Sequence, residues 1–460
     1  MRNKVCRQRY FRCYLGASLG CLLLTLPLAA QEATDLSFGV EQRVRNENWN
    51  NLFDYSGLRD DQRNQVRYRT RGWAQLTLGT LEFNVGLNSE TNQKIGFNNA
   101  VDEAVFDALN INIHKLFVKG LSLKVGRQDL IRGEGLILLE GTSGDGSRST
   151  YFNAVDLAYE FGKSKIEAIG ILDPRQDRFL PRINDQHKYL QDWDEQALGL
   201  YYTGKPAAST TVEAYFFHKK EVHDRLAPTD PAFQPDRRIE TAGTRITRRL
   251  DQRWTAAAEF AAQWGLQHPN TGIRAWAGYA HIKRESQAKM KPYILAGYYA
   301  LSGNDPSRPG EIRGWDPLFS RWPKWGDLEL YSAVPENGVG YATNQTRWQL
   351  ESGFSPARRL KWSFTYYRVG AFNAFGRNPA VFGTGTDRGN NLQTRLDFKV
   401  NDHLRGHIDY ETMLPGDFYA QSDRAYFLRF EMIADAATSV KKLKRRFDGN
   451  SATDQGGPSK

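Results

Sequence analysis

The sequence predicts an all-β fold, a single antiparallel barrel that crosses a membrane with about 18 strands, with about 16 as the alternative count. Three observations support this prediction. Apolar and polar residues alternate along many segments, no apolar run of helix-spanning length follows residue 30, and short connections alternate with long ones. A period of two is typical of strands with one oily and one polar face. Segments of about ten residues suit a tilted path through a bilayer.

Residues 1–30 have the features of a secretory signal peptide. Five basic residues lie within the first twelve positions, the run "LGASLGCLLLTLPLAA" follows, and Ala29 and Ala30 precede Gln31. A charged segment, a short apolar segment and small residues at the exit define such signals. A membrane anchor and a lipoprotein signal at Cys21 are the alternatives. All three cysteines lie in this segment, so the mature chain can form no disulfide and no Cys-ligated metal site.

Alternating segments follow one another along the rest of the chain. Leu36, Phe38 and Val40 begin the series, and "RNQVRYRTRGWAQLTL" (63–78) places arginine at 63, 67, 69 and 71 with neutral residues between them. The later segments are 81–88, 109–114, 155–161, 254–263, 347–354, 360–366, 392–400, 405–411 and 426–432. Each has one face suited to lipid or a core and one face suited to water.

The connections predict the orientation and the domain limits. Two short ones are "LGTLE" (78–82) and "FGKSK" (161–165). The long ones are 46–62, 130–150, 174–194, 221–238, 302–340 and 371–390. Short periplasmic turns and long extracellular loops are the arrangement of Gram-negative outer-membrane barrels. We expect one barrel domain over 31–433 and a basic, disordered tail over 434–460, which contains "KKLKRR".

A soluble β-sandwich is the alternative, because it also alternates. The aromatic residues near strand ends, the large number of strands and the export signal favour the outer-membrane barrel, in which the charged face lines the lumen. The inward arginines would then be Arg43, Arg45, Arg67, Arg69, Arg71, Arg245, Arg347, Arg395, Arg405 and Arg429. Without the signal, 57 basic residues face 52 acidic ones, which argues against a nucleic-acid-binding protein.

Two interpretations of these arginines stay open. Acidic residues share the polar faces, among them Glu41, Glu259 and Glu431, so cross-strand ion pairs would brace the wall. In 63–71, however, the arginine face carries no acidic residue of its own. Residues two apart lie about 7 Å apart along a strand. Such a ladder would keep an anionic polymer close to a guanidinium group at each step.

Several stretches resemble the alginate export family of outer-membrane barrels. They are "YRTRGWAQL" (68–76), "GRQDLIRGEGLIL" (126–138), "STYFNAVDLAYEF" (149–161), "GYYALSGNDPS" (297–307), "WDPLFSRWPKWGDLELYS" (315–332), "QTRLDFKVNDHLRGHIDYETMLPGDFY" (393–419) and "SDRAYFLRFEM" (422–432). The matches extend over 36–433, and their order and spacing carry the resemblance.

The resemblance implies a monomeric, eighteen-stranded barrel with an arginine-rich lumen that passes a polyuronate. Arg67, Arg69, Arg71 and Arg127 match the basic elements of the family. Export and uptake both remain open, and periplasmic transport components are candidate partners beside the polysaccharide and the outer-membrane lipid. The chain departs from the usual pattern because about 27 residues follow Ile433, whereas outer-membrane barrels usually finish on an aromatic residue of the last strand.

Two other functions are weighed against this one. A general or small-anion porin shares every feature except polymer specificity. A secreted polysaccharide-active enzyme would need two carboxyl groups at one bond, and Asp192 and Asp194 in "QDWDEQ" offer such a pair, although acidic pairs in loops are usually solvated. We expect a channel, no catalytic residues, no metal site and no cofactor.

Overall fold

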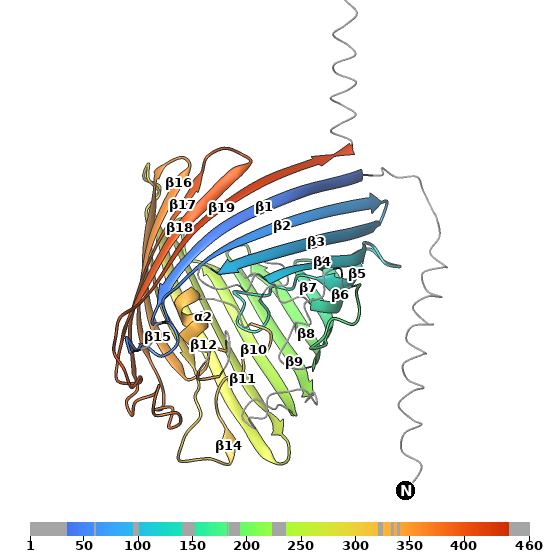
Figure 1. The fold of residues 1–460 in the computed structure, drawn as a ribbon. Coiled ribbons are helices and arrows are strands. Elements are labelled where there is room, and N and C mark those ends of the chain that lie inside the picture. Colours follow the sequence, from blue (N-terminus) through green and yellow to red (C-terminus); the bar gives the residue numbers. More distant parts are fainter. Residues whose placement is uncertain are drawn as a thin grey trace, which may run out of the picture.

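The computed structural model describes residues 35–58, 61–94, 101–139, 152–181, 183, 194–222, 236–320, 325–332, 335–337 and 341–440. These residues form one closed antiparallel β-barrel, with a short helix inside it and long connections at one end (Figure 1). The predicted signal peptide and the basic cluster after Val440 lie outside the described residues.

Eighteen strands form the wall, as the sequence predicted. They are β1 (Asp35–Asn50), β2 (Arg63–Leu78), β3 (Leu81–Lys94), β4 (Val101–Ile113), β5 (Leu121–Gln128), β6 (Phe152–Phe161), β7 (Ser164–Asp173), β8 (Asp194–Ala207), β9 (Thr210–Val222), β10 (Arg237–Arg249), β11 (Trp254–Gln267), β12 (Thr271–Glu285), β13 (Tyr293–Leu301), β15 (Gln345–Ala357), β16 (Leu360–Gly370), β17 (Asp387–Lys399), β18 (Leu404–Pro415) and β19 (Ala425–Ser439). The two-residue β14 (Glu311–Ile312) pairs in parallel with β12 and belongs to a connection.

The barrel is closed by β1, which pairs with both β2 and β19 (Figure 1). The β1–β19 register runs from Ser37 opposite Ser439 to Asn50 opposite Tyr426. Closure pairs the main-chain groups of the first and last strands, so neither is left as an open sheet edge.

The two ends of the barrel differ in the length of their connections. Gly79 and Gly162 make tight turns with φ of 60° and 56°, a conformation that glycine adopts without strain. These turns share their end with the start of β1 and the end of β19, whereas the long loops lie at the opposite end (Figure 1). This asymmetry is the one that the sequence predicted.

The strand faces are divided as the barrel prediction requires. Tyr68 on β2 is 42% exposed, whereas Arg67 and Arg69 beside it are 5% and 3% exposed. Leu428 and Phe430 on β19 are likewise exposed, and Arg429 between them is buried. Apolar residues therefore face outward and charged residues inward, which excludes the β-sandwich because a sandwich buries its apolar faces.

Among the described residues, no helix has the length and apolar character needed to cross a membrane.

Several predicted boundaries were wrong by a few residues. Residues 46–50 belong to β1 and 387–390 belong to β17, although both were predicted to be loop. The last strand continues to Ser439, six residues past the expected limit at 433. These strand ends carry few apolar residues and are extended by pairing with a neighbouring strand, as Asp435 does with Arg405. Such pairing cannot be recognised from the sequence of one segment alone.

The apolar core lies inside the barrel, where two connections fold inward. Leu136, Ile137 and Leu138 follow β5, and Trp315, Leu318 and Phe319 follow β14; all are buried in one cluster with inner-wall residues. The two connections bond to each other through the amide of Phe319 and the carbonyl of Ile137 at 3.1 Å. The short helix α2 (Asp327–Ser332) also lies inside the barrel, against β18 and β19 (Figure 1).

Candidate functional site

All eleven predicted arginines lie on barrel strands. Arg43 and Arg45 are on β1, Arg67, Arg69 and Arg71 on β2, Arg127 on β5, Arg245 on β10, Arg347 on β15, Arg395 on β17, Arg405 on β18 and Arg429 on β19. The closure brings β19, β1 and β2 side by side, so six of the eleven share one sector of the inner wall.

Glu47 on β1 is the centre of that sector. Its carboxylate accepts hydrogen bonds from Arg429 at 2.7 Å, from Arg67 at 3.1 Å and from Gln65 at 2.6 Å. Arg45 lies 3.5 Å from the same group and donates to Glu431 at 2.6 Å. All of these side chains are buried, so each charged group is stabilised by its ion-pair partners rather than by solvent.

The arginine ladder of β2 is therefore ion-paired. Its partners come from the neighbouring strands: Glu90 on β3 binds Arg67 at 2.8 Å, and Glu41 on β1 binds Arg69 at 2.7 Å. Arg71 binds Asp107 on β4 at 2.5 Å. The segment itself has no acid on this face. The adjacent strands supply one to Arg67 and one to Arg69, and Asp107, at a bulge of β4 one strand further away, supplies one to Arg71.

Exposure divides the eleven arginines into a buried group and an accessible group, with Arg245, whose side chain is 12% exposed, between them. Seven are buried: Arg43, Arg45, Arg67, Arg69, Arg127, Arg347 and Arg429. Larger fractions of the side chains of Arg71, Arg395 and Arg405 are exposed, 27%, 41% and 40%. These three guanidinium groups lie towards the end with the short turns and remain open to a solute, although each also has an acidic neighbour.

A polar pocket of about 190 Å³ lies beside Arg71. Its lining includes Lys124 and the amide side chains of Gln75, Asn84 and Asn110. Gln128 and the carboxylate of Asp129 complete its polar lining. The pocket thus combines two cations, four amides and one carboxylate, a set with net positive charge that can bind a carboxylate and donate to or accept from hydroxyl groups.

The opposite sector of the inner wall is rich in tyrosine. Tyr201, Tyr215 and Tyr279 are buried on β8, β9 and β12, and Tyr201 stacks on Tyr215 with ring centroids 5.6 Å apart. Their hydroxyl groups donate to Glu213 and Glu259 at 2.8 Å. Sequence analysis did not single out these tyrosines, because an inward tyrosine and an outward one look alike until the register is known.

The connection after β5 reaches this tyrosine sector. Its Glu134 carboxylate accepts a hydrogen bond from Arg245 at 2.9 Å and lies 3.0 Å from Nε2 of His281. Burial raises the pKa of the Glu134 carboxyl, but the hydrogen bonds from His281 and Arg245 outweigh it and bring the pKa down to about 2. Glu134 is therefore ionised at neutral pH.

Three carboxylates of α2 and β18 lie close together, with one oxygen from each of Asp327, Asp409 and Glu411 within 4.8 Å of the others. Arg429 binds Asp327 at 2.5 Å, and the amides of Asp327 and Leu328 donate to Glu411 at 2.9 and 3.0 Å. These partners account for the cluster as part of the ion-pair network that anchors the helix.

The paired carboxylates of the enzyme alternative do not form a described site. Asp192 lies outside the described residues. Asp194 starts β8, where it accepts from the amide of Arg175 at 2.8 Å and from Arg178 at 2.7 Å. Its described contacts are those of a carboxylate that fastens a loop to a strand.

The sequence matches the family described as Alginate export over residues 34–430. This chain belongs to the alginate export family. The match covers nearly the whole barrel, from the start of β1 into β19. A comparison with curated protein sequences finds no match.

Solved structures with a similar fold are outer-membrane porins of Pseudomonas aeruginosa. OpdK, crystallised with vanillate, has a TM-score of 0.54 and 11% identity over 87% of this chain and 99% of its own. OccK3 (OpdO) has a TM-score of 0.55 and 13% identity over 88% and 96%. OccK2 (OpdF) in complex with glucuronate has 0.55 and 12% over 89% and 99%. At such identities the similarity concerns the fold.

This member of the alginate export family is thus an outer-membrane channel. The family match and the porin-like closed barrel both indicate transport through the inside of the barrel rather than catalysis. Outer-membrane barrels direct short turns to the periplasm and long loops outward. The exposed arginines therefore lie towards the periplasm, and the inward-folded connections enter from the cell surface.

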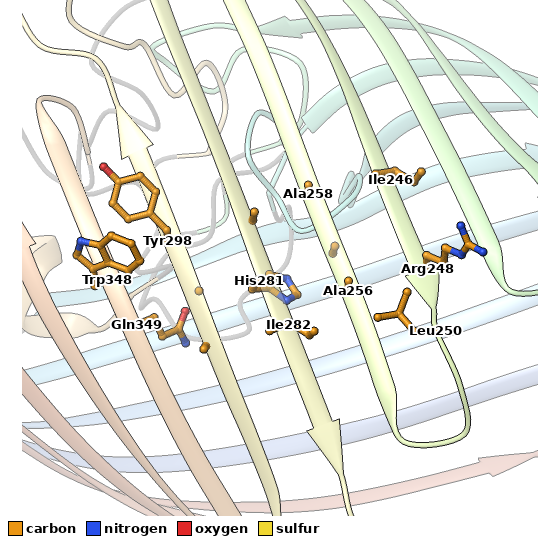
Figure 2. A pocket seen from close by; sticks show the side chains of 14 residues that line it. Ile246, Arg248, Leu250, Ala256, Ala258, His281, Ile282, Tyr298, Trp348 and Gln349 are labelled. Carbon is orange, nitrogen blue, oxygen red and sulfur yellow. The ribbon is translucent and has the colours of Figure 1, made fainter.

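The outer wall of the alginate-export barrel carries a groove of about 560 Å³ (Figure 2). Small residues such as Ala256 and Ala258 form its floor, and Ile246, Tyr298 and Trp348 flank it. Trp348 is 63% exposed on the outward face, so this groove belongs to the lipid-facing surface and lies outside the conduit.

Several interior residues of the alginate-export barrel were missed by sequence analysis. Glu47 continues the odd-numbered register of Arg43 and Arg45 and could have been found if β1 had been extended past Arg45. The acidic residues on connections had no such signal, because loops lack a period. They are Glu134, Asp177, Asp316, Asp327, Glu329 and Glu336.

Proposed function

We propose that this channel passes an anionic polysaccharide of the polyuronate class, such as alginate, or its oligomers. The observation that carries the proposal is the polar pocket beside Arg71, which offers two cations and four amides against one carboxylate on the inner wall. A uronate unit presents one carboxylate and several hydroxyl groups, which match that set of donors and acceptors.

The strength of these contacts suits transport. Two unit charges 4 Å apart interact with about 1 kcal/mol in water and about 4 kcal/mol at an effective dielectric of 20. Contacts of this size attract a polyanion without trapping it, as conduction requires. Arg395 and Arg405, which are 41% and 40% exposed, extend the accessible positive charge along the wall.

The test is planar-bilayer conductance with and without added polyuronate. We expect polyuronate to block the open channel at concentrations where a neutral glucan of equal length does not. The variant Arg71→Gln/Lys124→Gln should weaken that block about tenfold or more, because it removes two charges from the pocket. Arg358→Gln, which changes an exposed arginine in the turn between β15 and β16, is the matched control.

This pair disturbs fewer ion pairs than substituting the whole β2 ladder, because the only buried acid that it deprives of a described partner is Asp107. Heat-modifiable gel migration verifies that the double variant is folded. Changing Arg67 and Arg69 would leave Glu47, Glu90 and Glu41 with fewer partners. Breaking a buried pair costs about 3–5 kcal/mol, so a loss of block could then reflect misfolding. Equal block by the neutral glucan would contradict the proposed polymer class.

A small-anion porin is the second candidate function. The inward-folded connections after β5 and β14 fill part of the interior with apolar side chains, which favours small solutes. Two of the similar porins were solved with vanillate and with glucuronate, both small carboxylates. Block by monomeric glucuronate without additional block by the polymer would favour this second function.

A further inference from the structure

Glu134 occupies a position from which a carboxylate reaches a guanidinium and an imidazole of the inner wall. Its Oε1 lies 2.9 Å from Nη2 of Arg245 on β10, and its two oxygens lie 3.0 Å from Nε2 of His281 on β12. Gly133 before it has a φ of 58° and sits against the Arg245 side chain. The Glu134 side chain is 30% exposed, so solvent inside the barrel reaches the site.

The ring of Tyr279 lies beside both side chains. Tyr279 stacks on His281 with ring centroids 5.8 Å apart and an interplanar angle of 7°. The hydroxyl group of Tyr279 accepts from Arg245 at 2.9 Å. A uronate has a carboxylate and an apolar ring face. Hydrogen-bond donors such as a guanidinium can bind its carboxylate, and an aromatic ring beside them can pack against its apolar face.

Arg245 has acidic neighbours on the wall as well as on the connection. Arg245 also pairs with Glu213 and lies 3.9 Å from Glu259. Two acidic residues next to Arg245 therefore belong to strands of the wall, and the third, Glu134, belongs to the connection after β5. Exchanging Glu134 for another carboxylate leaves the total charge of the site unchanged.

The same arrangement recurs at other wall arginines. Asp177, on the connection after β7, binds Arg127 with two hydrogen bonds of 2.7 and 2.8 Å. Glu336 binds Arg388 on β17 at 2.9 and 2.7 Å, and Glu329 of α2 pairs with Arg347. In each case a carboxylate on a loop or on α2 forms an ion pair with an arginine on a strand.

We propose that Arg245 and His281 form a uronate subsite that Glu134 fills when no solute is present. A uronate unit takes the place of the Glu134 carboxylate, and residues 132–136 around it move off the tyrosine sector. This inference rests on the proposed function, because it names a subsite for the same class of solute. A tethered group competes at an effective concentration of about millimolar, so weak solutes displace it only when they are abundant.

The experiment compares wild type with Glu134→Gln in planar bilayers, using sodium glucuronate as the probe and glucose as the neutral counterpart. Removing the competing charge should strengthen glucuronate block about tenfold and leave glucose without effect. Glu134→Ala is a second variant that also removes the hydrogen-bonding amide. Glu311→Gln is the matched control. Glu311 is also a carboxylate on a connection, the one between β13 and β15, and it pairs with Arg313 of that connection.

Two further measurements make the result decisive. Heat-modifiable gel migration verifies that each variant is a folded barrel. In the Glu134→Gln background, Arg245→Lys keeps the charge but loses the fork that binds a carboxylate, and it should abolish the gain in glucuronate block.

Unchanged glucuronate block in both Glu134 variants would overturn the subsite, and Glu134 would then only brace the wall. That result leaves the proposed function intact if wild type still prefers polyuronate to neutral glucan. Conversely, wild type that does not distinguish the two polymers contradicts the proposed function, while a stronger glucuronate block in Glu134→Gln still supports a carboxylate subsite.

Discussion

At the scale of single residues, ion pairs between arginine and carboxylate side chains stabilise the interior of the barrel. Glu47 faces three arginines, Arg45, Arg67 and Arg429, and is itself 0% exposed. In a buried site, a carboxylate that accepts several hydrogen bonds is well stabilised. Removing it leaves several buried cations without their anionic partner. The arginine ladder is thus first of all a structural network.

We expect Glu47→Gln to lower the free energy of unfolding by about 3–5 kcal/mol, because it leaves a buried group of arginines without their shared anion. Urea titration of the barrel refolded in detergent measures the change. Glu285→Gln removes a carboxylate that is 58% exposed and should change stability by less than about 0.5 kcal/mol. Similar values for the two variants would show that Glu47 is not the centre of the network.

At the scale of elements, β5 departs from simple alternation just where Arg127 lies. Arg127 and Gln128 are both buried, although they are neighbours in the sequence. Gly126 before them has a φ of 119°, and a Cβ there would lie 2.3 Å from the carbonyl oxygen of Leu109. This backbone, which glycine tolerates, lets Arg127 reach Asp177 while Gln128 donates to the carbonyl of Ala154 at 3.0 Å.

Gly126→Ala is therefore expected to destabilise the barrel by about 1–3 kcal/mol, the cost of a strained backbone position, and to loosen the connection held by Asp177. Urea titration gives the first effect, and hydrogen exchange of residues 174–181 gives the second. Gly170→Ala on β7 is the matched control, because a Cβ there meets no atom within 4 Å. Protection of 174–181 that is equal in both variants would contradict this account.

Elements also set the limit of what the alternating pattern could predict. The segment 63–78 was found with the bounds that β2 has, because its apolar and charged residues alternate to both ends. The ends of β1 and β19 were placed too early, because asparagine, alanine and threonine give no clear alternation there. Strand ends of this kind are fixed by the neighbouring strand.

At the scale of the whole molecule, the barrel depends on the contact between its first and last strands. Residues 434–439 pair with Ser37–Gln42 of β1, and Arg405 on β18 binds both Asp435 and Glu41 across this seam. The segment predicted to start a disordered tail therefore completes the wall.

Ending the chain after Ile433 should weaken closure, because it leaves 37–42 of β1 paired with β2 alone and opens a sheet edge on the β19 side. Ending it after Val440 keeps every described pair. We expect the shorter form to lose its heat-modifiable migration at a lower temperature than the longer form in the same detergent. Equal unfolding temperatures would indicate that the last six residues of β19 do not contribute to closure.

The sequence by itself determined the class of fold, because a period of two along each strand records which face meets lipid and which faces inward. It also placed the predicted arginines on the strands, since the charged face is a local property. Only the tertiary structure decided which acid binds each arginine and which connections fill the interior. Register and loop position depend on contacts between segments far apart in the chain, such as Glu47 with Arg429 and Glu134 with Arg245, and these contacts leave no periodic signal in either segment.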